Sequence, residues 1–414
     1  MNIFRQLNQY LPDSTQKNLI LITGARQTGK TTLVQQRYPH LTYFNLDAPE
    51  NREFIQQVSS FHWGELIGNA IIDEAQKEPV VFEKVKFAYD AGNIQFSALL
   101  GSSQIVLLKK IRESLAGRIV LFELFPLMLS EIANPTQLRV PLLDNLLTHK
   151  NIDEVLQHQT MLLAPASAVK IRQVCDYVLQ WGGMPKLLQI KNDLERQKWL
   201  KDYEYTYLER DLVDLARLDD LQPFRTLQKV AALRSGHLLN YSELARDTGV
   251  KVDTAKRYLQ YLQLSYQVIL LQPFYRNLTS VAIKTPKIYW LDMGILRSLT
   301  SQFGATLGNH FETFVVAEII KWIKSTQRDC KYYFYRTRSG LEVDILLQTP
   351  HGIIGIEIKY RERIYTKDYS SLVTVAKELS HEWLGGIVIY TGDKLQKVDD
   401  SADIWIVPIE RIFF

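Results

Sequence analysis

Short apolar runs separated by polar, helix-forming stretches dominate the first 130 residues. The stretch that follows the first run, residues 32–38, has helical spacing. Strands that alternate with helices are typical of α/β domains. We therefore predict an α/β domain over residues 1–130, with buried strands at 18–23, 69–73, 95–100 and 119–123.

Residues 131–220 have mostly helical spacing, with apolar side chains three and four positions apart in 142–147, 152–156 and 169–181. We expect a helical lid that packs on the preceding domain. The charged cluster Glu209, Arg210 and Asp211 is explained most simply by ion pairs along one helix, and this segment predicts no chemistry of its own.

Residues 221–300 follow the order helix, turn, helix and two strands, which predicts a winged-helix domain. Ser242 and Gly249 are residue types that start and stop a helix, and Asp253 is the expected cap of the second helix. The two strands of the wing are expected at 268–274 and 287–291.

The last part of the chain, residues 301–414, returns to an α/β pattern, and we interpret the run 404–407 as core packing. Helices are expected at 309–323 and 370–379, and strands at 330–335, 342–347, 352–359 and 385–390.

The chain has two cysteines and no apolar run near the ~20 residues that cross a bilayer. Its first ten residues lack the basic start and apolar core of a secretory signal. We expect a cytoplasmic protein without a membrane partner, a disulfide framework or a cysteine-based zinc site.

The segment from Gly24 to Thr31, GARQTGKT, matches the phosphate-binding pattern GxxxxGK[ST] between a strand and a helix. Backbone N–H groups at the start of a helix point at an anion, Lys30 neutralises phosphate charge, and the Thr31 hydroxyl suits Mg²⁺. The predicted nucleotide-binding residues are Gly24, Ala25, Arg26, Gln27, Thr28, Gly29, Lys30, Thr31, Thr32 and Ser102.

Two acids end the second buried run. Asp73 is placed to hold the metal with Thr31, and Glu74 to polarise an attacking water, so ATP hydrolysis with Mg²⁺ is expected rather than binding alone. Ser102 follows the third strand, where a small polar residue suits a γ-phosphate sensor. Arg118 is a candidate to stabilise the transition state, from its own or a neighbouring subunit, and an ordinary surface arginine is the alternative.

A second set of acids and a lysine lies near the C-terminus. Asp344 is on one strand, and Glu357 and Lys359 share a face of the next because side chains alternate with period two. This is the D…ExK arrangement of PD-(D/E)XK nucleases, in which Asp344 and Glu357, with Glu312 from the preceding helix, would bind Mg²⁺ and Lys359 would activate water. A nuclease fold kept for binding and an unrelated α/β domain remain alternatives.

Charge is unevenly spread, with ten Lys/Arg against three acids between residues 221 and 290, although the whole chain carries only +4. Lys251, Lys256 and Arg257 fall on or beside the second helix of the predicted winged helix. This favours nucleic acid, DNA rather than RNA, as a partner. The alternative is a winged helix that only bridges domains.

The segments GARQTGKTTL, AIIDEAQKEP, LLGSSQ, ESLAGR and ELFPLMLSEI occur in this order. Together they resemble a group of bacterial and archaeal AAA-type ATPases whose C-terminal domain of unknown function is related to restriction-endonuclease folds. The motifs GGMP at 182–185, YLERD at 207–211 and PKIYWLD at 286–292 extend the resemblance over most of the chain. The resemblance implies ATP binding and this architecture but no substrate.

The sequence thus predicts a P-loop (AAA-like) core, a helical lid, a winged helix and a PD-(D/E)XK nuclease-like α/β domain. Two functions fit: an ATPase that acts on nucleic acid through a metal-dependent nuclease domain, and an ATP-dependent switch whose C-terminal domain is a non-catalytic platform for protein or nucleic acid. The sequence leaves open whether the chain forms a homo-oligomer.

Overall fold

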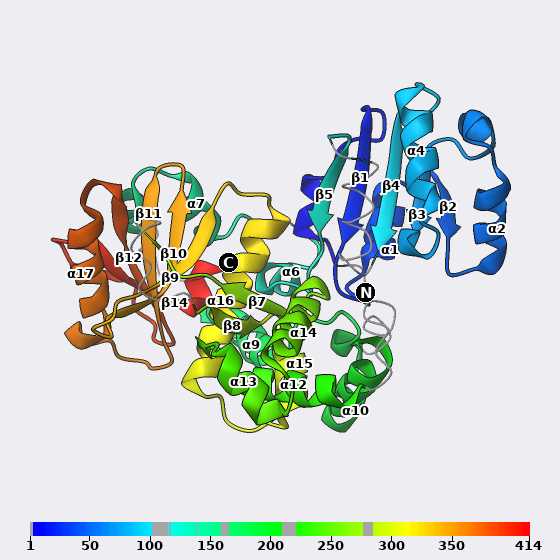
Figure 1. Ribbon diagram of the computed structural model, residues 1–414. Helices are drawn as coiled ribbons and strands as arrows, with labels where there is room; N and C mark the ends of the chain where they lie inside the picture. Colours follow the sequence, from blue (N-terminus) through cyan, green and yellow to red (C-terminus); the bar gives the residue numbers. More distant parts are fainter. Residues whose placement is uncertain are drawn as a thin grey trace.

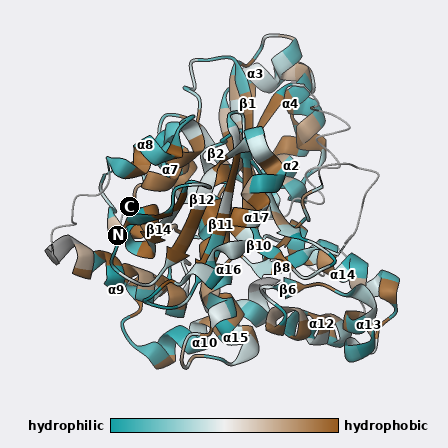
Figure 2. Cartoon of the chain, turned by 90° about the vertical axis from the view of Figure 1, so that its left-hand side faces the viewer, coloured by the Kyte–Doolittle hydropathy of each residue, from teal (hydrophilic) through white to brown (hydrophobic). Residues whose placement is uncertain are grey.

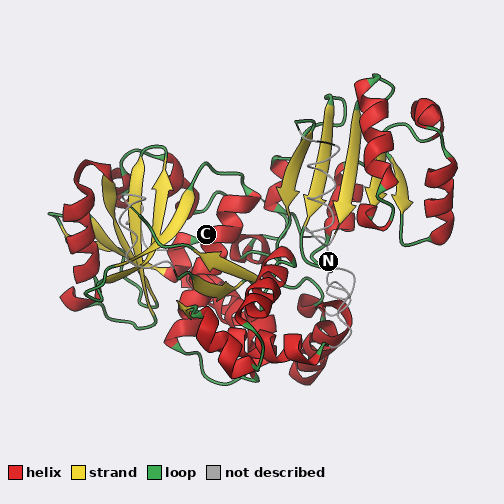
Figure 3. Ribbon diagram, in the orientation of Figure 1, coloured by secondary structure: helices red, strands yellow, loops and turns green. Residues whose placement is uncertain are grey.

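The computed structural model describes residues 3–101, 115, 117–137, 139–158, 165–208, 221–275 and 285–414. These residues form two bodies, an N-terminal α/β domain and a larger body built from the rest of the chain (Figure 1). Each body has a sheet of its own, and the larger one has a second, smaller sheet (Figure 3).

The N-terminal domain is built on a five-stranded sheet in the order β2-β3-β4-β1-β5, and all neighbouring strands are parallel. Apolar strands are favoured here because helices cover a parallel sheet on both faces. The four predicted strands are confirmed within one residue. The elements are β1 (Asn18–Thr23), α1 (Lys30–Arg37), β2 (Thr42–Asn45), α2 (Pro49–Gln57), α3 (Trp63–Leu66), β3 (Ala70–Asp73), α4 (Val80–Asp90), β4 (Phe96–Gly101) and β5 (Ile119–Glu123).

The helical segment that follows does not form the expected lid over its whole length. Its buried leucines belong to the core of the larger body, and the Trp405 indole donates a hydrogen bond to Asp153 Oδ1 at 2.8 Å. The expectation was wrong here because apolar spacing reveals a buried face but not what covers it. The helices are α6 (Leu129–Ala133), α7 (Leu142–Thr148), α8 (Ile152–Gln157), α9 (Pro165–Trp181) and α10 (Asp193–Tyr203).

The order predicted for the winged helix is present, but two caps differ. Asn240, not Ser242, accepts the first amide hydrogen bonds of α13, and α14 begins one residue before Asp253. Gly249 ends α13 with φ +69°, as predicted. The elements are α12 (Gln222–Leu233), β6 (His237–Leu238), α13 (Tyr241–Thr248), α14 (Val252–Leu264), β7 (Val268–Leu271), β8 (Lys287–Trp290) and α15 (Met293–Thr300).

The C-terminal part is a six-stranded mixed sheet in the order β13-β14-β12-β11-β10-β9. Neighbouring strands from β9 to β11 are antiparallel, and β11, β12 and β14 are parallel. The run 404–407 is a strand rather than packing alone, and β13 was not predicted. The elements are α16 (Gly308–Ser325), β9 (Lys331–Arg336), β10 (Glu342–Thr349), β11 (Gly352–Lys359), α17 (Ser370–Leu379), β12 (Trp383–Tyr390), β13 (Gln396–Asp399), β14 (Ile404–Pro408) and α18 (Ile409–Ile412).

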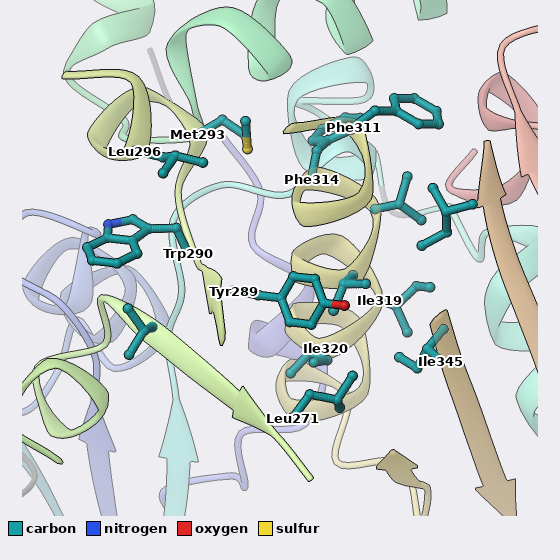
Figure 4. Close-up of a cluster of buried hydrophobic side chains, with 14 of the residues drawn as sticks. Leu271, Tyr289, Trp290, Met293, Leu296, Phe311, Phe314, Ile319, Ile320 and Ile345 are labelled. Atoms are coloured by element: carbon teal, nitrogen blue, oxygen red, sulfur yellow. The ribbon is translucent and has the colours of Figure 1, made fainter. Parts of the chain in front are cut away.

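The middle and C-terminal parts share one hydrophobic core, which runs from Met128 to Phe413 without a break at the predicted boundary near residue 300. Strand β8, buried along its whole length, packs against α16, and Tyr289 points toward this helix (Figure 4). Figure 2 shows that hydrophobic residues concentrate in central strands such as β1 and β11. Among the described residues, no helix has both the length and the apolar character that crossing a membrane requires.

The glycine pair of the GGMP motif joins the two bodies. The Gly183 N–H donates to Asp292 Oδ2 at 2.8 Å, and the Leu127 N–H donates to the Gly183 carbonyl at 2.7 Å. A Cβ on Gly183 would lie 2.1 Å from the Leu127 carbonyl oxygen. Asp292 is the last residue of PKIYWLD, so this hydrogen bond brings the two motifs into contact. Asp292 also caps α15.

Candidate functional site

The loop after β1 has the backbone geometry of a phosphate-binding loop. Gly24 packs so tightly that a Cβ there would lie 2.1 Å from the Leu124 carbonyl oxygen, and Gly29 precedes α1 with φ +95°. Both positions therefore require glycine. The amide groups at the start of α1 face outward from the helix end, which is where an anion is stabilised.

Three predicted side chains meet beside this loop. The Lys30 ammonium donates to the carbonyl oxygens of Gly24 and Ala25 at 2.8 and 2.9 Å. Thr31 Oγ1 donates to Asp73 Oδ2 at 2.5 Å, which joins α1 to the end of β3. A hydroxyl and a carboxylate in contact are hard oxygen donors of the kind that Mg²⁺ prefers, so this pair fits the predicted metal.

Glu74 follows Asp73 in the left-handed region, with φ +53°, and its carboxylate accepts a hydrogen bond from Gln76. Burial raises the pKa of Glu74, while the charges of Lys30 and Arg26 act in the opposite direction. A carboxylate with a raised pKa near phosphate-binding groups suits a general base. The structure therefore brings Glu74 to the nucleotide site, as the sequence predicts.

Contacts that the sequence did not reveal hold the phosphate-binding loop from outside. Buried Arg5 donates to the carbonyl oxygens of Thr28 and Phe125 at 2.7 and 2.6 Å. Tyr203 Oη of α10 donates to the Arg26 carbonyl at 3.0 Å, and Tyr266 Oη lies 2.5 Å from Thr23 Oγ1. No local pattern points to these residues, because each comes from a segment distant in sequence.

One predicted residue does not join this site, and another is not described. Arg118 pairs with Asp90 at 2.6 Å and precedes β5, so it lies at the amino edge of the parallel sheet, whereas the loop and Asp73 lie at the carboxyl edge. The expectation that Arg118 serves the nucleotide of its own subunit is therefore wrong. Action on a neighbouring subunit stays a prediction. Ser102 lies outside the described residues, as do the ion pairs expected at 209–211.

The second predicted site assembles in the C-terminal sheet. The register that pairs Ile345 with Ile356 continues to Asp344 and Glu357, which therefore lie side by side on neighbouring strands. Asp344 Oδ2 accepts a hydrogen bond from the Ile358 N–H at 2.8 Å, and Lys359 Nζ donates to Glu357 Oε2 at 2.7 Å. Asp344 and Glu357 are both buried.

Lys287 of β8 enters this group of acids. Its ammonium lies 3.1 Å from Glu312 Oε1, 2.5 Å from Glu342 Oε1 and 3.7 Å from Asp344 Oδ1. We call the acids Glu312, Glu342, Asp344 and Glu357 the carboxylate cluster. Lys287 is one of the ten basic residues between positions 221 and 290, but its side chain is only 3% exposed.

Burial and the charges within the carboxylate cluster shift the pKa values of its members. Burial, and then the charge of Asp344, raise the pKa of Glu312 to about 7 and raise that of Glu357 well above its usual value. Burial alone would lower the pKa of Lys287, but the charges of Glu312, Asp344 and Glu342 raise it instead. The lysine is therefore held in its charged form by the acids around it.

Comparison with known protein families divides the chain into three matched regions. Residues 16–133 match an AAA domain, residues 172–306 a domain of unknown function (DUF8612), and residues 307–412 a second domain of unknown function (DUF4143). The chain thus joins an AAA-type P-loop ATPase domain, of a class that uses ATP with Mg²⁺, to two C-terminal domains of unknown function. This confirms the AAA-type ATPase domain with C-terminal domains of unknown function, whereas the winged helix and the relation to restriction endonucleases stay predictions.

The relatives are uncharacterized prokaryotic proteins. One from Mycobacterium tuberculosis is 27% identical over 82% of this chain and 70% of its own length. One from Methanocaldococcus jannaschii is 23% identical over 82% of this chain and 73% of its own length. Among solved structures, the Walker-type ATPase of Pyrococcus abyssi is 14% identical, with a TM-score of 0.48 over 72% of this chain and 96% of that one.

Proposed function

We propose that this protein is an ATP-hydrolysing switch that acts on nucleic acid, with its C-terminal domain serving as a binding platform. The observation that carries this proposal is the set of contacts that the larger body makes with the phosphate-binding loop. Tyr203 and Tyr266 both belong to that body, and both hydrogen-bond to the loop or to the strand that leads into it.

The nucleotide site brings together residues that suit hydrolysis. Lys30 and the amide groups at the start of α1 bind phosphate oxygens, and Thr31 with Asp73 would hold Mg²⁺. Bound Mg²⁺ draws negative charge away from the phosphates. Glu74 accepts the proton of the attacking water, and Gln76 orients its carboxylate.

A conformational change in the phosphate-binding loop would reach the larger body through a few direct contacts. The Lys30 ammonium donates to the Gly24 and Ala25 carbonyls, and phosphate oxygens compete with these neutral acceptors. Ala25 packs in a small cluster with Phe125, Tyr266 and Leu291. Movement of the loop on ATP binding therefore alters the contacts that seat the winged-helix part.

The expected partner surface lies on α13 and α14. Arg246, Lys251, Lys256 and Arg257 are all exposed there, and Asp253 is the acid nearest Lys256, at 3.9 Å. Strand β8 is buried, so α14 is the better candidate for phosphate contacts among the described elements of this part. Backbone contacts of this kind give salt-dependent binding.

The test combines hydrolysis with DNA binding. Lys30→Ala should abolish ATP hydrolysis, and Glu74→Gln should bind ATP without hydrolysing it. DNA affinity of Glu74→Gln should change when ATP is added, and the change should vanish in a Tyr203→Phe/Tyr266→Phe variant. Lys256→Glu/Arg257→Glu should weaken DNA binding, whereas Lys367→Glu, an exposed lysine on the C-terminal domain, is the charge control. DNA affinity that ignores nucleotide in every variant would contradict the switch.

A second candidate function is metal-dependent cleavage of nucleic acid. The placement of Asp344 beside Glu357, with Lys359 on the same strand, favours it. So does the element order of one helix, three antiparallel strands, one helix and a parallel strand. Cleavage of labelled DNA and RNA with Mg²⁺ or Mn²⁺, lost in Asp344→Ala, would establish it. The ion pairs of Lys287 count against it.

A further inference from the structure

The carboxylate cluster already contains a cation that belongs to the chain. The Lys287 ammonium contacts Glu312, Glu342 and Asp344, which come from α16 and β10, while the lysine itself comes from β8. Its side chain is 3% exposed, so water contributes little to its charge balance. A buried ammonium requires this kind of pairing, because burial without a partner is very costly.

Each acid of the cluster has donors of its own. Glu312 accepts from Lys287 and, at 2.7 Å, from Tyr289 Oη. Glu342 accepts from Lys287 and, at 2.8 Å, from Arg336. Asp344 accepts the Ile358 amide, and Glu357 accepts Lys359. The oxygens that would bind a metal are therefore engaged by N–H and O–H groups.

The donor set does not fit a divalent cation in this arrangement. Mg²⁺ needs oxygen ligands at about 2.0–2.1 Å in an octahedron, and an ammonium among the same oxygens repels it. Within the part of the chain that the structure describes, no group of three or more His, Cys, Asp or Glu side chains is arranged to hold a metal ion.

The backbone fixes Lys287 in this place. Strand β8 lies between β6 and β7, and its Tyr289, two positions further along on the same face, binds the same carboxylate as Lys287. Beyond β7 the chain continues onto the C-terminal sheet, where the backbone N–H of Phe274 donates to the Phe334 carbonyl at 2.7 Å. Lys287 and Tyr289 thus lie on an element that is packed on both sides (Figure 4).

We propose that Lys287 is the resident cation of the carboxylate cluster, occupying the place of a divalent metal and fastening the winged-helix part to the C-terminal sheet. The cluster binds no divalent cation while β8 is seated, and removal of this one ammonium converts it into a metal site. This inference concerns the second candidate function and does not depend on ATP hydrolysis.

The experiment measures Mn²⁺ binding to the full-length, nucleotide-free protein by electron paramagnetic resonance. Wild type should show no Mn²⁺ binding that depends on Asp344. Lys287→Met should bind one additional Mn²⁺ per chain, and Lys287→Met/Asp344→Asn should lose it. Mn²⁺ should also raise the thermal unfolding temperature of Lys287→Met but not that of wild type, because a ligand that binds only the folded state stabilises it.

Controls separate this inference from a general loss of structure. Lys324→Met removes another α16-associated lysine pair, with Glu123, and should gain no Mn²⁺ site. Lys287→Arg keeps the charge and should also gain none. A single cooperative thermal unfolding transition shows that a variant is folded, and Lys287→Gln serves if Lys287→Met is not. Wild-type binding that is lost in Asp344→Asn would overturn the proposal, as would a folded Lys287→Met or Lys287→Gln without a new site.

Discussion

The nucleotide site and the carboxylate cluster use the same residue types in opposite ways. Each has a buried lysine close to an aspartate and a glutamate. In the first, the Lys30 ammonium donates to neutral carbonyl oxygens of its own loop. In the second, Lys287 contacts three carboxylates. An ammonium–carboxylate contact adds the attraction of two opposite charges to the hydrogen bond, and an ammonium–carbonyl contact lacks it, so an incoming phosphate competes more easily for Lys30 than for Lys287.

Whether the acids of a catalytic motif can bind a metal therefore depends on the charged side chains that already contact them. The acids of the nucleotide site contact hydroxyl and amide groups, as Asp73 contacts Thr31 and Tyr43, and keep the capacity to attract a cation. In the carboxylate cluster, Lys287 has already supplied that cation. Matching substitutions at the two sites therefore test the difference directly.

The largest difference is expected for the glutamates. Glu74→Gln should lower the rate constant of ATP hydrolysis by about 100-fold or more, because general bases contribute about 10²–10⁴-fold. ATP binding should persist, since Lys30 and the loop amides are unchanged. Glu357→Gln is the same chemical change at the other site and should leave hydrolysis within about twofold. A steady-state phosphate-release assay measures both. Equal losses in the two variants would show that the sites are not independent.

The two lysines should also differ in their contribution to stability. Lys287→Met should lower the free energy of unfolding by about 3 kcal/mol, because it removes the buried ammonium that Glu312, Glu342 and Asp344 share. Lys30→Met removes hydrogen bonds to carbonyl oxygens, which carry no charge themselves, and should cost less, about 2 kcal/mol. Equilibrium urea unfolding, with the m-values compared, measures both. A smaller loss for Lys287→Met than for Lys30→Met would refute the assignment of Lys287 as a buried counter-ion.

At both sites, the residues that lie close together in the sequence were predictable. The nucleotide site was predictable because Gly24 to Thr31 is one contiguous segment, and because Asp73 and Glu74 end a buried strand whose carboxyl edge the parallel sheet fixes. In the C-terminal part, Asp344, Glu357 and Lys359 were also found, since the period of a strand places them on neighbouring positions. Local spacing was sufficient for each of these residues.

Residues that act across long sequence distances were not predictable. The residues that precede and follow Lys287 in the sequence do not indicate that it is buried. Only the packing of β8 on α16 shows that it lies among acids. Arg5 is separated from its partner Glu131 by most of the ATPase domain. For the helices at 142–157, the spacing predicted the buried face correctly but not the body on which that face packs. Which surfaces meet is decided by tertiary packing, and a single sequence does not report it.

The pH dependence of ATP hydrolysis tests whether Glu74 is the general base. Burial raises the pKa of Glu74, and hydrolysis needs its ionised form, so activity is present above that pKa and is lost as the pH falls through it. The acidic limb should therefore lie above the usual range of a glutamate. Because the hydrogen bond from Gln76 lowers the pKa of Glu74, Gln76→Ala should move the limb further upward. Rate constants at saturating Mg-ATP between pH 4.5 and 8 provide the measurement, and an unmoved limb in Gln76→Ala would contradict this assignment.

The smallest effect is expected at the pair that joins the two bodies. Helix α16 carries Glu312 near its start and Lys324 near its end, about 18 Å further along its axis, where Lys324 contacts Glu123 of β5 at 3.0 Å. The Lys324 side chain is 32% exposed, so Lys324→Gln should cost at most about 1 kcal/mol of unfolding free energy.

The double variant of Lys324→Gln with Lys287→Met asks whether this one helix couples the two sites. At such a distance and without shared partners, the two losses should add within about 0.5 kcal/mol. Additivity in urea unfolding, with the ATP hydrolysis rate of the double variant equal to that of Lys324→Gln alone, would leave the loop contacts of Tyr203 and Tyr266 as the route between the bodies. A larger coupling energy would instead assign that route to α16, and the carboxylate cluster would then be part of the switch.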